Sequence, residues 1–88
     1  MTKQNMIEQI EFISNPLQWP RWPLLPLRKD DEFEFMGYKT GVISANDPTI
    51  VRLTNLFMLP PTIEEFNQIP SEIYPSIASM VKDGWYVD

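Results

Sequence analysis

The chain has 88 residues and contains neither cysteine nor histidine. Disulfide frameworks, thiolate metal sites and ordinary zinc modules are therefore excluded, as is catalysis by an imidazole base. Twelve acidic residues against seven basic ones give a net charge of -5, and the basic residues are scattered along the chain. Direct binding to nucleic acid is not expected, because contacts to phosphates need clustered lysine and arginine.

Length and composition predict a single compact domain over residues 1–88. A chain this short buries only about 60–65% of the surface of its unfolded form, so modest stability is expected. The hydrophobic fraction of 43% and the charged fraction of 22% are typical of a globular protein. The domain divides into an N-terminal helix (1–14), a Trp/Pro-rich arm (15–28), a β-hairpin region (29–58) and helical segments with a terminal strand (59–88).

The N-terminal stretch predicts one amphipathic helix from Thr2 to Ile13, since its apolar residues recur at helical spacing. Thr2 is expected to cap the helix, and Asn15-Pro16 to end it. We expect the helix to cover one face of a sheet, with docking onto a partner as the alternative. Its mixture of charged and apolar residues is typical of neither a signal peptide nor a membrane span, and we expect a cytoplasmic protein without membrane contact.

The arm, NPLQWPRWPLLPLR, contains four of the nine prolines and two of the three tryptophans. Two sets of its residues recur every three positions: Pro20, Pro23 and Pro26, and Trp19, Trp22 and Leu25. Three residues per turn is the period of a polyproline II helix. The segment WPLLPLR also has the spacing of proline-rich ligands that dock in aromatic grooves. The alternative is that the tryptophans pack onto the core of the chain itself.

Two further stretches predict single strands. Leu24–Arg28 is expected at a sheet edge, because Pro23 and Pro26 cannot donate to a ladder. Glu32–Met36 alternates strictly, with both phenylalanines on one face, which is the pattern of a half-buried strand.

The firmest local prediction is a hairpin. Its strands would be 39–45 and 49–57, joined by the turn residues Asn46-Asp47-Pro48. The apolar run 56–59 at the end of the second strand is expected to belong to the core, with an exposed patch as the alternative.

Two capped helices and a short strand are expected after Pro61. Thr62 with Glu65 forms a capping box, and that helix should end near Gln68. Ser76 is expected to cap the next helix and Gly84 to end it, before the β-prone residues 85–88. The predicted fold is therefore α+β, with a small, mainly antiparallel sheet of three to four strands and short N-terminal and C-terminal helices.

No catalytic, cofactor-binding or metal-binding residue stands out. Three glycines cannot build a glycine-rich phosphate loop, and no calcium-loop spacing is present. The expected contacts with a protein partner are large aromatic and arginine side chains of the arm, which are common anchors of interfaces: Trp19, Arg21, Trp22 and Arg28. An alternative acidic surface consists of Asp30, Asp31, Glu32 and Glu34.

The arm, the RLTNLF strand, the PPTIEEF helix start and the terminal VKDGWYVD together resemble small uncharacterised proteins encoded by bacteriophages and prophages. The resemblance implies the cytoplasm of an infected host cell and an accessory role.

The leading hypothesis is a non-enzymatic module that binds and modulates a host or phage protein, as a monomer or weak homo-oligomer. One alternative is an inhibitor that imitates nucleic acid with its acidic surface. A further alternative is a structural subunit of an assembly.

Overall fold

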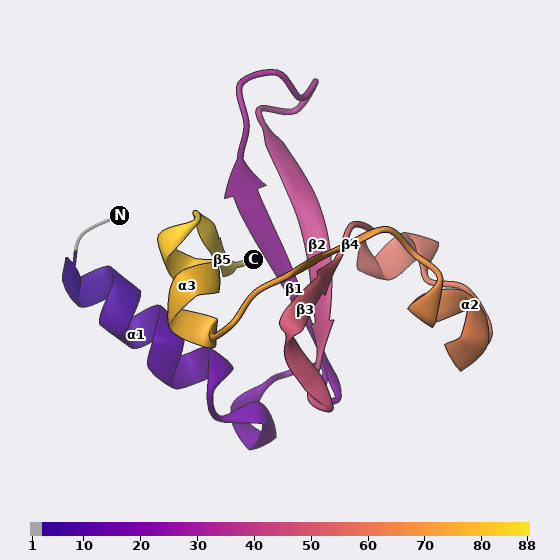
Figure 1. Ribbon diagram of the computed structural model, residues 1–88, viewed down its shortest axis with the longest axis horizontal. Helices are drawn as coiled ribbons and strands as arrows, with labels where there is room; N and C mark the ends of the chain where they lie inside the picture. Colours follow the sequence, from indigo (N-terminus) through magenta and orange to yellow (C-terminus); the bar gives the residue numbers. More distant parts are fainter. Residues whose placement is uncertain (1–2) are drawn as a thin grey trace.

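The computed structural model describes residues 3–88, which form an α+β fold around a five-stranded antiparallel sheet (Figure 1). The sheet order is β4-β3-β2-β1-β5. The strands are β1 (Leu24–Asp30), β2 (Tyr38–Ser44), β3 (Asp47–Arg52), β4 (Ser71–Ile73) and β5 (Trp85–Val87). The predicted fold class is confirmed, whereas three to four strands was too few. The sequence of β4 gives no strand signal, because it has only three residues and lies between Pro70 and Pro75.

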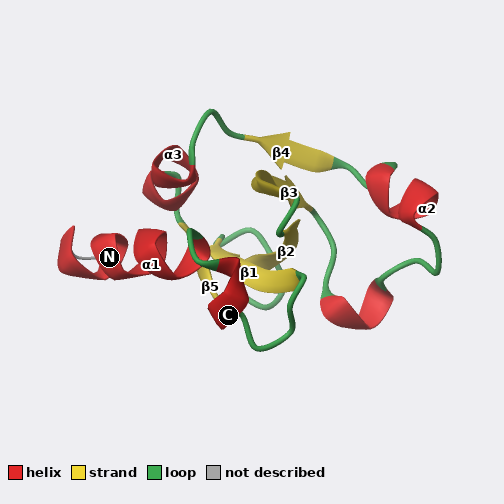
Figure 2. Cartoon of the chain, turned by 90° about the horizontal axis from the view of Figure 1, so that it is seen from below, coloured by secondary structure: helices red, strands yellow, loops and turns green. Residues whose placement is uncertain are grey.

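The two longest helices lie together on one face of the sheet, which we call the helix face (Figure 2). It carries α1 (Lys3–Ile13) and α3 (Ile77–Lys82), which pack against each other and against β5. The opposite face, which we call the open face, looks toward residues 53–70. This segment, the excursion, leaves the sheet after β3 and returns at β4, and it contains η2 (Leu56–Met58) and α2 (Ile63–Asn67).

The core lies between the sheet and the two helices of the helix face. Alternate strand residues point into it, as the two-residue period of a strand requires. Its buried members are Ile13, Trp19, Leu25, Leu27, Ile43, Val51, Met80, Val81 and Trp85. The core thus joins the N-terminal helix, the arm, four strands and the last helix.

Trp85 is the largest fully buried side chain among the described residues, and Gly41 makes room for it. A Cβ atom added at Gly41 would lie 3.1 Å from two carbons of the Trp85 ring and would overlap Cγ1 of Val51. Lys29 and Lys39 lie about the same ring, with ammonium groups 6.0 and 5.9 Å from its centroid. Gly41 is therefore required by close packing of an aromatic ring on the strand.

The predicted helix boundaries are confirmed where the structure describes them. The Thr62 hydroxyl accepts a hydrogen bond from the backbone N–H of Glu65 at 3.1 Å. Ser76 forms a reciprocal capping box with Ser79, and Gly84 follows α3 with a φ of 111°. The predicted cap Thr2 lies outside the described residues.

The arm does not form the polyproline helix that its period predicts. It starts with the one-turn helix η1 (Pro16–Gln18), continues through a turn over residues 20–23 and enters β1 at Leu24. Backbone hydrogen bonds close this path, from Trp22 N–H to the Trp19 carbonyl at 3.3 Å and from Leu24 N–H to the Arg21 carbonyl at 3.0 Å. A polyproline helix has no internal hydrogen bonds. Burial of Trp19 and of β1 therefore overrides the threefold spacing.

Strand β1 is internal to the sheet rather than at its edge. Pro26 fits there because β5 is short: the β1–β5 register runs only from Leu27 opposite Val87 to Lys29 opposite Trp85. The Pro26 carbonyl accepts a hydrogen bond from the Asp88 backbone N–H at 3.1 Å, just past that ladder. Pro26 has no backbone N–H, and it lies just outside the β1–β5 ladder, where no donor is needed.

The predicted strand Glu32–Met36 is wrong, because these residues form the loop between β1 and β2. Its two phenylalanines are both exposed, so the alternation does not reflect burial.

The hairpin of β2 and β3 is confirmed, but β3 ends at Arg52, and the pairing of Ser44 with Asp47 places the turn at Ala45-Asn46. The predicted second strand, 49–57, was too long because its end was placed from the apolar residues that follow Arg52.

We predict that Gly41→Ala lowers the free energy of unfolding by about 1–3 kcal/mol or more, because the added methyl overpacks the space beneath Trp85. Denaturant unfolding followed by tryptophan fluorescence measures this. The control is Thr40→Val on the same strand, which should change stability by less than about 1 kcal/mol. Equal stability of the Gly41→Ala protein and the wild type would contradict this packing.

Candidate protein-interaction site

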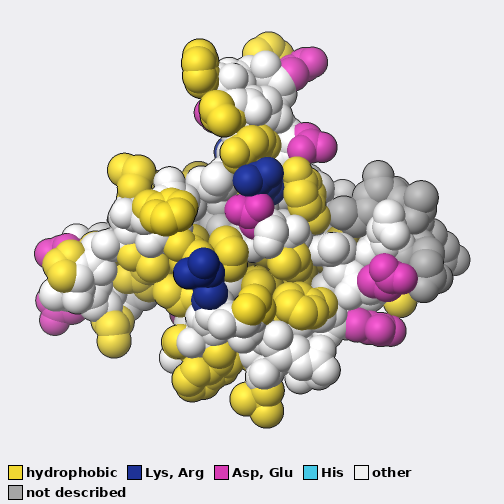
Figure 3. All heavy atoms as spheres, turned by 180° about the vertical axis from the view of Figure 1, so that it is seen from behind, with side chains coloured by type: hydrophobic (Ala, Val, Ile, Leu, Met, Phe, Trp, Pro, Cys, Tyr) yellow, Lys and Arg dark blue, Asp and Glu magenta, His cyan; other side chains and the backbone are white. Residues whose placement is uncertain are grey.

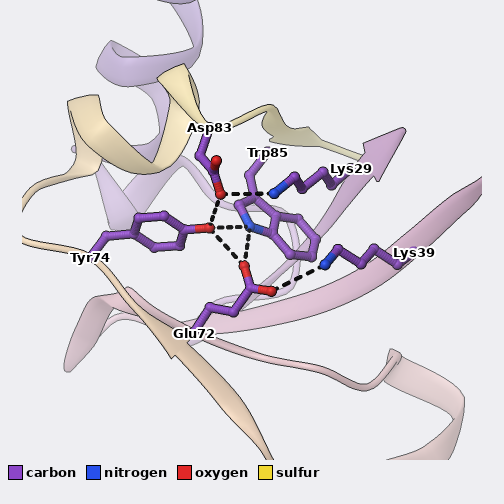
Figure 4. A network of polar contacts seen from close by, with 6 residues as sticks. All are labelled: Lys29, Lys39, Glu72, Tyr74, Asp83 and Trp85. Carbon is purple, nitrogen blue, oxygen red and sulfur yellow. Dashed lines mark hydrogen bonds and ion pairs between the residues drawn. The ribbon is translucent and has the colours of Figure 1, made fainter. Parts of the chain in front are cut away.

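A polar network joins distant parts of the chain at the end of the helix face (Figure 4). Its centre is the Tyr74 hydroxyl oxygen, which lies 2.7 Å from Glu72 Oε1 and 2.5 Å from Asp83 Oδ2. The Trp85 indole N–H donates to the same hydroxyl at 2.9 Å. The network thus fixes the orientation of the buried indole ring.

Two lysines complete the network. Lys29 of β1 lies 2.8 Å from Asp83, and Lys39 of β2 lies 3.1 Å from Glu72. Sequence reasoning missed this cluster, since Lys29 and Asp83 are 54 residues apart and no local pattern marks the pair.

The pKa directions indicate a structural role for the network. Burial raises the pKa of Glu72, but hydrogen bonds from Tyr74, Lys39 and Trp85 outweigh this and leave it below its usual range. The Lys29 and Tyr74 hydrogen bonds lower the pKa of Asp83. Burial and the two carboxylates raise the pKa of Tyr74. These directions lead away from neutral pH, where a general acid or base works best.

The loop between β1 and β2 forms the end of a projecting hairpin (Figure 1). We call Phe33, Phe35 and Met36 the apolar tip. Phe33 is 91% exposed, Phe35 is fully exposed and Met36 is also exposed. Burial of such side chains is worth about 1.5–3 kcal/mol each, which the chain leaves unused here.

The backbone under the apolar tip is held by hydrogen bonds. Asp31 N–H donates to the Gly37 carbonyl at 2.9 Å, and two further bonds link Glu34 to Asp31 and Gly37 to Glu34. The Asp31 carboxylate accepts from Phe33 N–H at 3.0 Å, as in an Asx-turn. Gly37 has a φ of 83°, which favours glycine. The loop is therefore ordered by its own backbone, independently of its exposed side chains.

The excursion carries a second set of exposed apolar side chains. Phe57 is 99% exposed, and Met58 and Ile63 are also exposed. The prediction that residues 56–59 belong to the core is therefore wrong for Phe57 and Met58. The cause is that β3 ends four residues before Leu56, so this run lies on the excursion rather than in the sheet.

Arg52 fixes the excursion to the sheet. It is buried, and its Nη2 donates to Asn67 Oδ1 at 3.0 Å and lies 3.3 Å from Asp47 Oδ2. Its guanidinium also lies over the Phe66 ring, 4.7 Å from the centroid. The base of the excursion is closed by a backbone bond from Leu53 N–H to the Pro70 carbonyl.

Grooves lie between the excursion and the open face. The first groove, of about 490 Å³, is lined among others by Arg21, Pro26, Thr40, Leu56, Phe57 and Asp88. The second, of about 390 Å³, has walls that include Leu24, Pro60, Pro61, Ile63 and Phe66. The excursion is thus attached at its ends without filling the space over the sheet.

The structure separates the predicted contacts of the arm. Trp19 is 3% exposed, and its indole N–H donates to the Phe12 carbonyl at 3.1 Å, so it belongs to the core and offers no surface to a partner. Trp22 is 58% exposed, and Arg21 is exposed at the first groove. Arg28 is half-buried: its Nε lies 2.9 Å from Asp88 Oδ1, and its guanidinium lies 4.2 Å from the Tyr38 ring centroid.

The predicted acidic residues lie together at the same end as the apolar tip. Asp30 accepts a hydrogen bond from the Tyr86 hydroxyl at 2.8 Å, which raises the pKa of Tyr86. Glu32 and Glu34 are exposed and alternate with the phenylalanines. In Figure 3, hydrophobic and acidic side chains accordingly gather at the projecting end. Within residues 3–88, no acidic side chains are grouped in a way that could hold a metal ion.

Comparison with protein-family models, curated proteins and solved structures finds no match to this chain. In the described part of the chain, every helix is too short or too polar to span a bilayer.

We predict that Tyr74→Phe lowers the free energy of unfolding at neutral pH by about 1–3 kcal/mol, since two carboxylates and the Trp85 indole N–H lose their common hydrogen-bond partner. The lowered pKa values of Glu72 and Asp83 stabilise the fold above their ordinary values of 4.5 and 3.8. That stabilisation is lost as the pH falls through the folded-state values. The difference between wild type and variant should therefore shrink in acid.

Urea unfolding at neutral pH and in acid measures this difference. The control is Tyr86→Phe, which removes one exposed hydrogen bond of a tyrosine hydroxyl, the bond to Asp30. A difference that stays constant or grows in acid would contradict the linkage. The raised pKa of Tyr74 also predicts loss of wild-type stability as the pH rises from its ordinary value of 10.0 through its folded-state value.

The two arm tryptophans should respond differently to truncation. Trp19→Ala is expected to cost about 3–5 kcal/mol, as for other buried aromatic residues. Trp22→Ala should leave the fold intact and weaken capture of a partner if Trp22 is a contact. Thermal unfolding monitored by circular dichroism tests the first part, and unfolding of the Trp22→Ala protein would assign that side chain to the core.

Proposed function

We propose that this chain is a non-enzymatic protein-binding module that inserts its apolar tip into a pocket of a protein partner. The observation that carries the proposal is a loop with an ordered backbone and fully exposed aromatic side chains. Such a loop has already lost backbone freedom before binding, which lowers the entropic cost of association. Phenylalanine adds large apolar area with few rotatable bonds.

The charge around the tip defines the partner further. Asp31, Glu32 and Glu34 alternate with the apolar side chains, whereas the nearest lysines, Lys29 and Lys39, are paired with carboxylates of the network. A partner pocket rimmed by lysine or arginine would match this pattern, and charge complementarity would speed association. The resemblance to phage-encoded proteins adds a host or phage protein as the partner of this proposal.

The alternative of a nucleic-acid mimic has one observation in its favour, the gathering of Asp30, Asp31, Glu32 and Glu34 at one end. Two of them serve the chain itself, since Asp30 accepts from Tyr86 and Asp31 accepts from Phe33 N–H. The remaining glutamates alternate with phenylalanines, which phosphate imitation would not require. The apolar tip therefore supports recognition of a protein pocket better.

The test compares capture by immobilised wild type with capture by the tip variant, Phe33→Ser/Phe35→Ser. We expect a protein retained from a bacterial lysate by the wild type to be lost with the tip variant, because hot-spot aromatic contacts carry much of the binding energy. Ile63→Ser is the control, since it removes a largely exposed apolar side chain from the excursion. Equal retention by wild type and tip variant would refute the tip as the binding surface.

A matched charge variant separates the two hypotheses. Glu32→Gln/Glu34→Gln keeps the phenylalanines and removes two carboxylates. Tip insertion predicts that this variant still captures the partner, with slower association and weaker salt dependence. A nucleic-acid mimic predicts loss of capture with these substitutions and retention with the serine substitutions.

A further inference from the structure

The first groove and the apolar tip have complementary chemistry at different places on the same molecule. The tip offers aromatic rings and exposed carboxylates, and the groove offers apolar walls and an arginine. We propose that a second copy of this chain is a partner of the apolar tip and receives it in the first groove. This inference rests on the proposed function, because it assumes that the tip is a binding surface.

The groove has suitable size and walls for aromatic side chains. Its volume of about 490 Å³ lies within the range of roughly 300–1,000 Å³ that ligand pockets occupy. Pro26 of β1 and Leu56 and Phe57 of the excursion give it apolar walls, and Thr40 gives it a polar group. Phe57 is almost fully exposed, so an inserted ring would cover it as well as the tip.

The charges of the two surfaces are opposite where they would meet. Arg21 lines the groove and is exposed, and within the described residues it has no carboxylate partner. Asp88 also lines the groove, but its carboxylate lies 2.9 Å from Arg28 and is therefore compensated. Glu32 and Glu34 likewise have no lysine or arginine partner among the side chains of residues 5–88. Insertion of the tip would bring these glutamates to Arg21.

The two phenylalanines of the tip do not line the first groove of their own chain. Pro26 at the groove is four residue steps from Asp30 at the end of β1, roughly 13 Å at 3.3 Å per residue. The antiparallel pairing of β1 with β2 over its full length keeps the hairpin extended in this direction. The contact would therefore join unlike surfaces of two copies, head to tail, and would form rings or open chains.

Head-to-tail contact makes a distinctive prediction for mixtures. The tip variant Phe33→Ser/Phe35→Ser keeps its groove, and the groove variant Arg21→Glu/Phe57→Ala keeps its tip. Each variant alone should associate about tenfold or more weakly than wild type. An equimolar mixture should form a heterodimer that grows no further, because one intact tip meets one intact groove.

Sedimentation velocity from micromolar to near-millimolar protein measures these species, and Ile63→Ser should associate like the wild type. Circular dichroism and thermal unfolding first show that each variant is folded, which exposure of all four substituted side chains favours. The proposal is supported if heterodimers form in the mixture while each variant by itself stays largely unassociated. A wild type that stays monomeric, association that survives in the tip variant, or a mixture without heterodimers each overturns it.

These outcomes are separate from the test of the proposed function. A monomeric wild type whose capture of another protein depends on the tip would overturn only the second copy as partner. Loss of both self-association and tip-dependent capture would overturn the function as well.

Discussion

The structure depends on the position of the Trp85 indole. Its ring lies against Gly41, where an added Cβ would lie 3.1 Å from two ring carbons, and its N–H is held by the Tyr74 hydroxyl at 2.9 Å. Through these contacts the three-residue strands β4 and β5, which could not persist alone, are fixed to the long β1–β2 hairpin. The carboxylates of Asp83 and Glu72 near the ring are paired with Lys29 and Lys39. The core is therefore bordered at this end by polar side chains that bond to one another.

The hydrophobic core lies on the helix face of the sheet, between the strands and the helices α1 and α3. The open face therefore contributes less to that core. The excursion touches the sheet through Arg52 and its backbone closure, and it keeps Phe57 and Met58 in solvent. A small chain has little apolar surface to spare, which makes exposed phenylalanines in two separate ordered segments informative. Burying them would add to the stability of the fold, and their exposure is the observation on which the proposed binding function rests.

Local signals in the sequence predicted most elements, and tertiary contacts decided the rest. The caps at Thr62 and Ser76 and the stop at Gly84 act within one turn of chain, so they could be read directly. Strand β4 and the network around Tyr74 depend on residues far apart in sequence and gave no local signal. Periodicity was misleading in the arm and over Glu32–Met36, because a spacing of two or three residues does not reveal whether a core is present beneath it.

The candidate site could be anticipated only in part for the same reason. Aromatic residues of the arm were singled out as possible anchors, yet Trp19 is in the core, and Phe33 and Phe35, which the strand pattern assigned to a buried face, are almost fully exposed. The acidic residues beside those rings oppose contact between tips, because like charges on neighbouring tips repel and the net charge of -5 opposes unspecific association. Under the proposed function, a surface with both an apolar recess and a cation would overcome this repulsion. The tip would then combine an apolar contact, which supplies affinity, with a charged rim, which restricts the choice of partner.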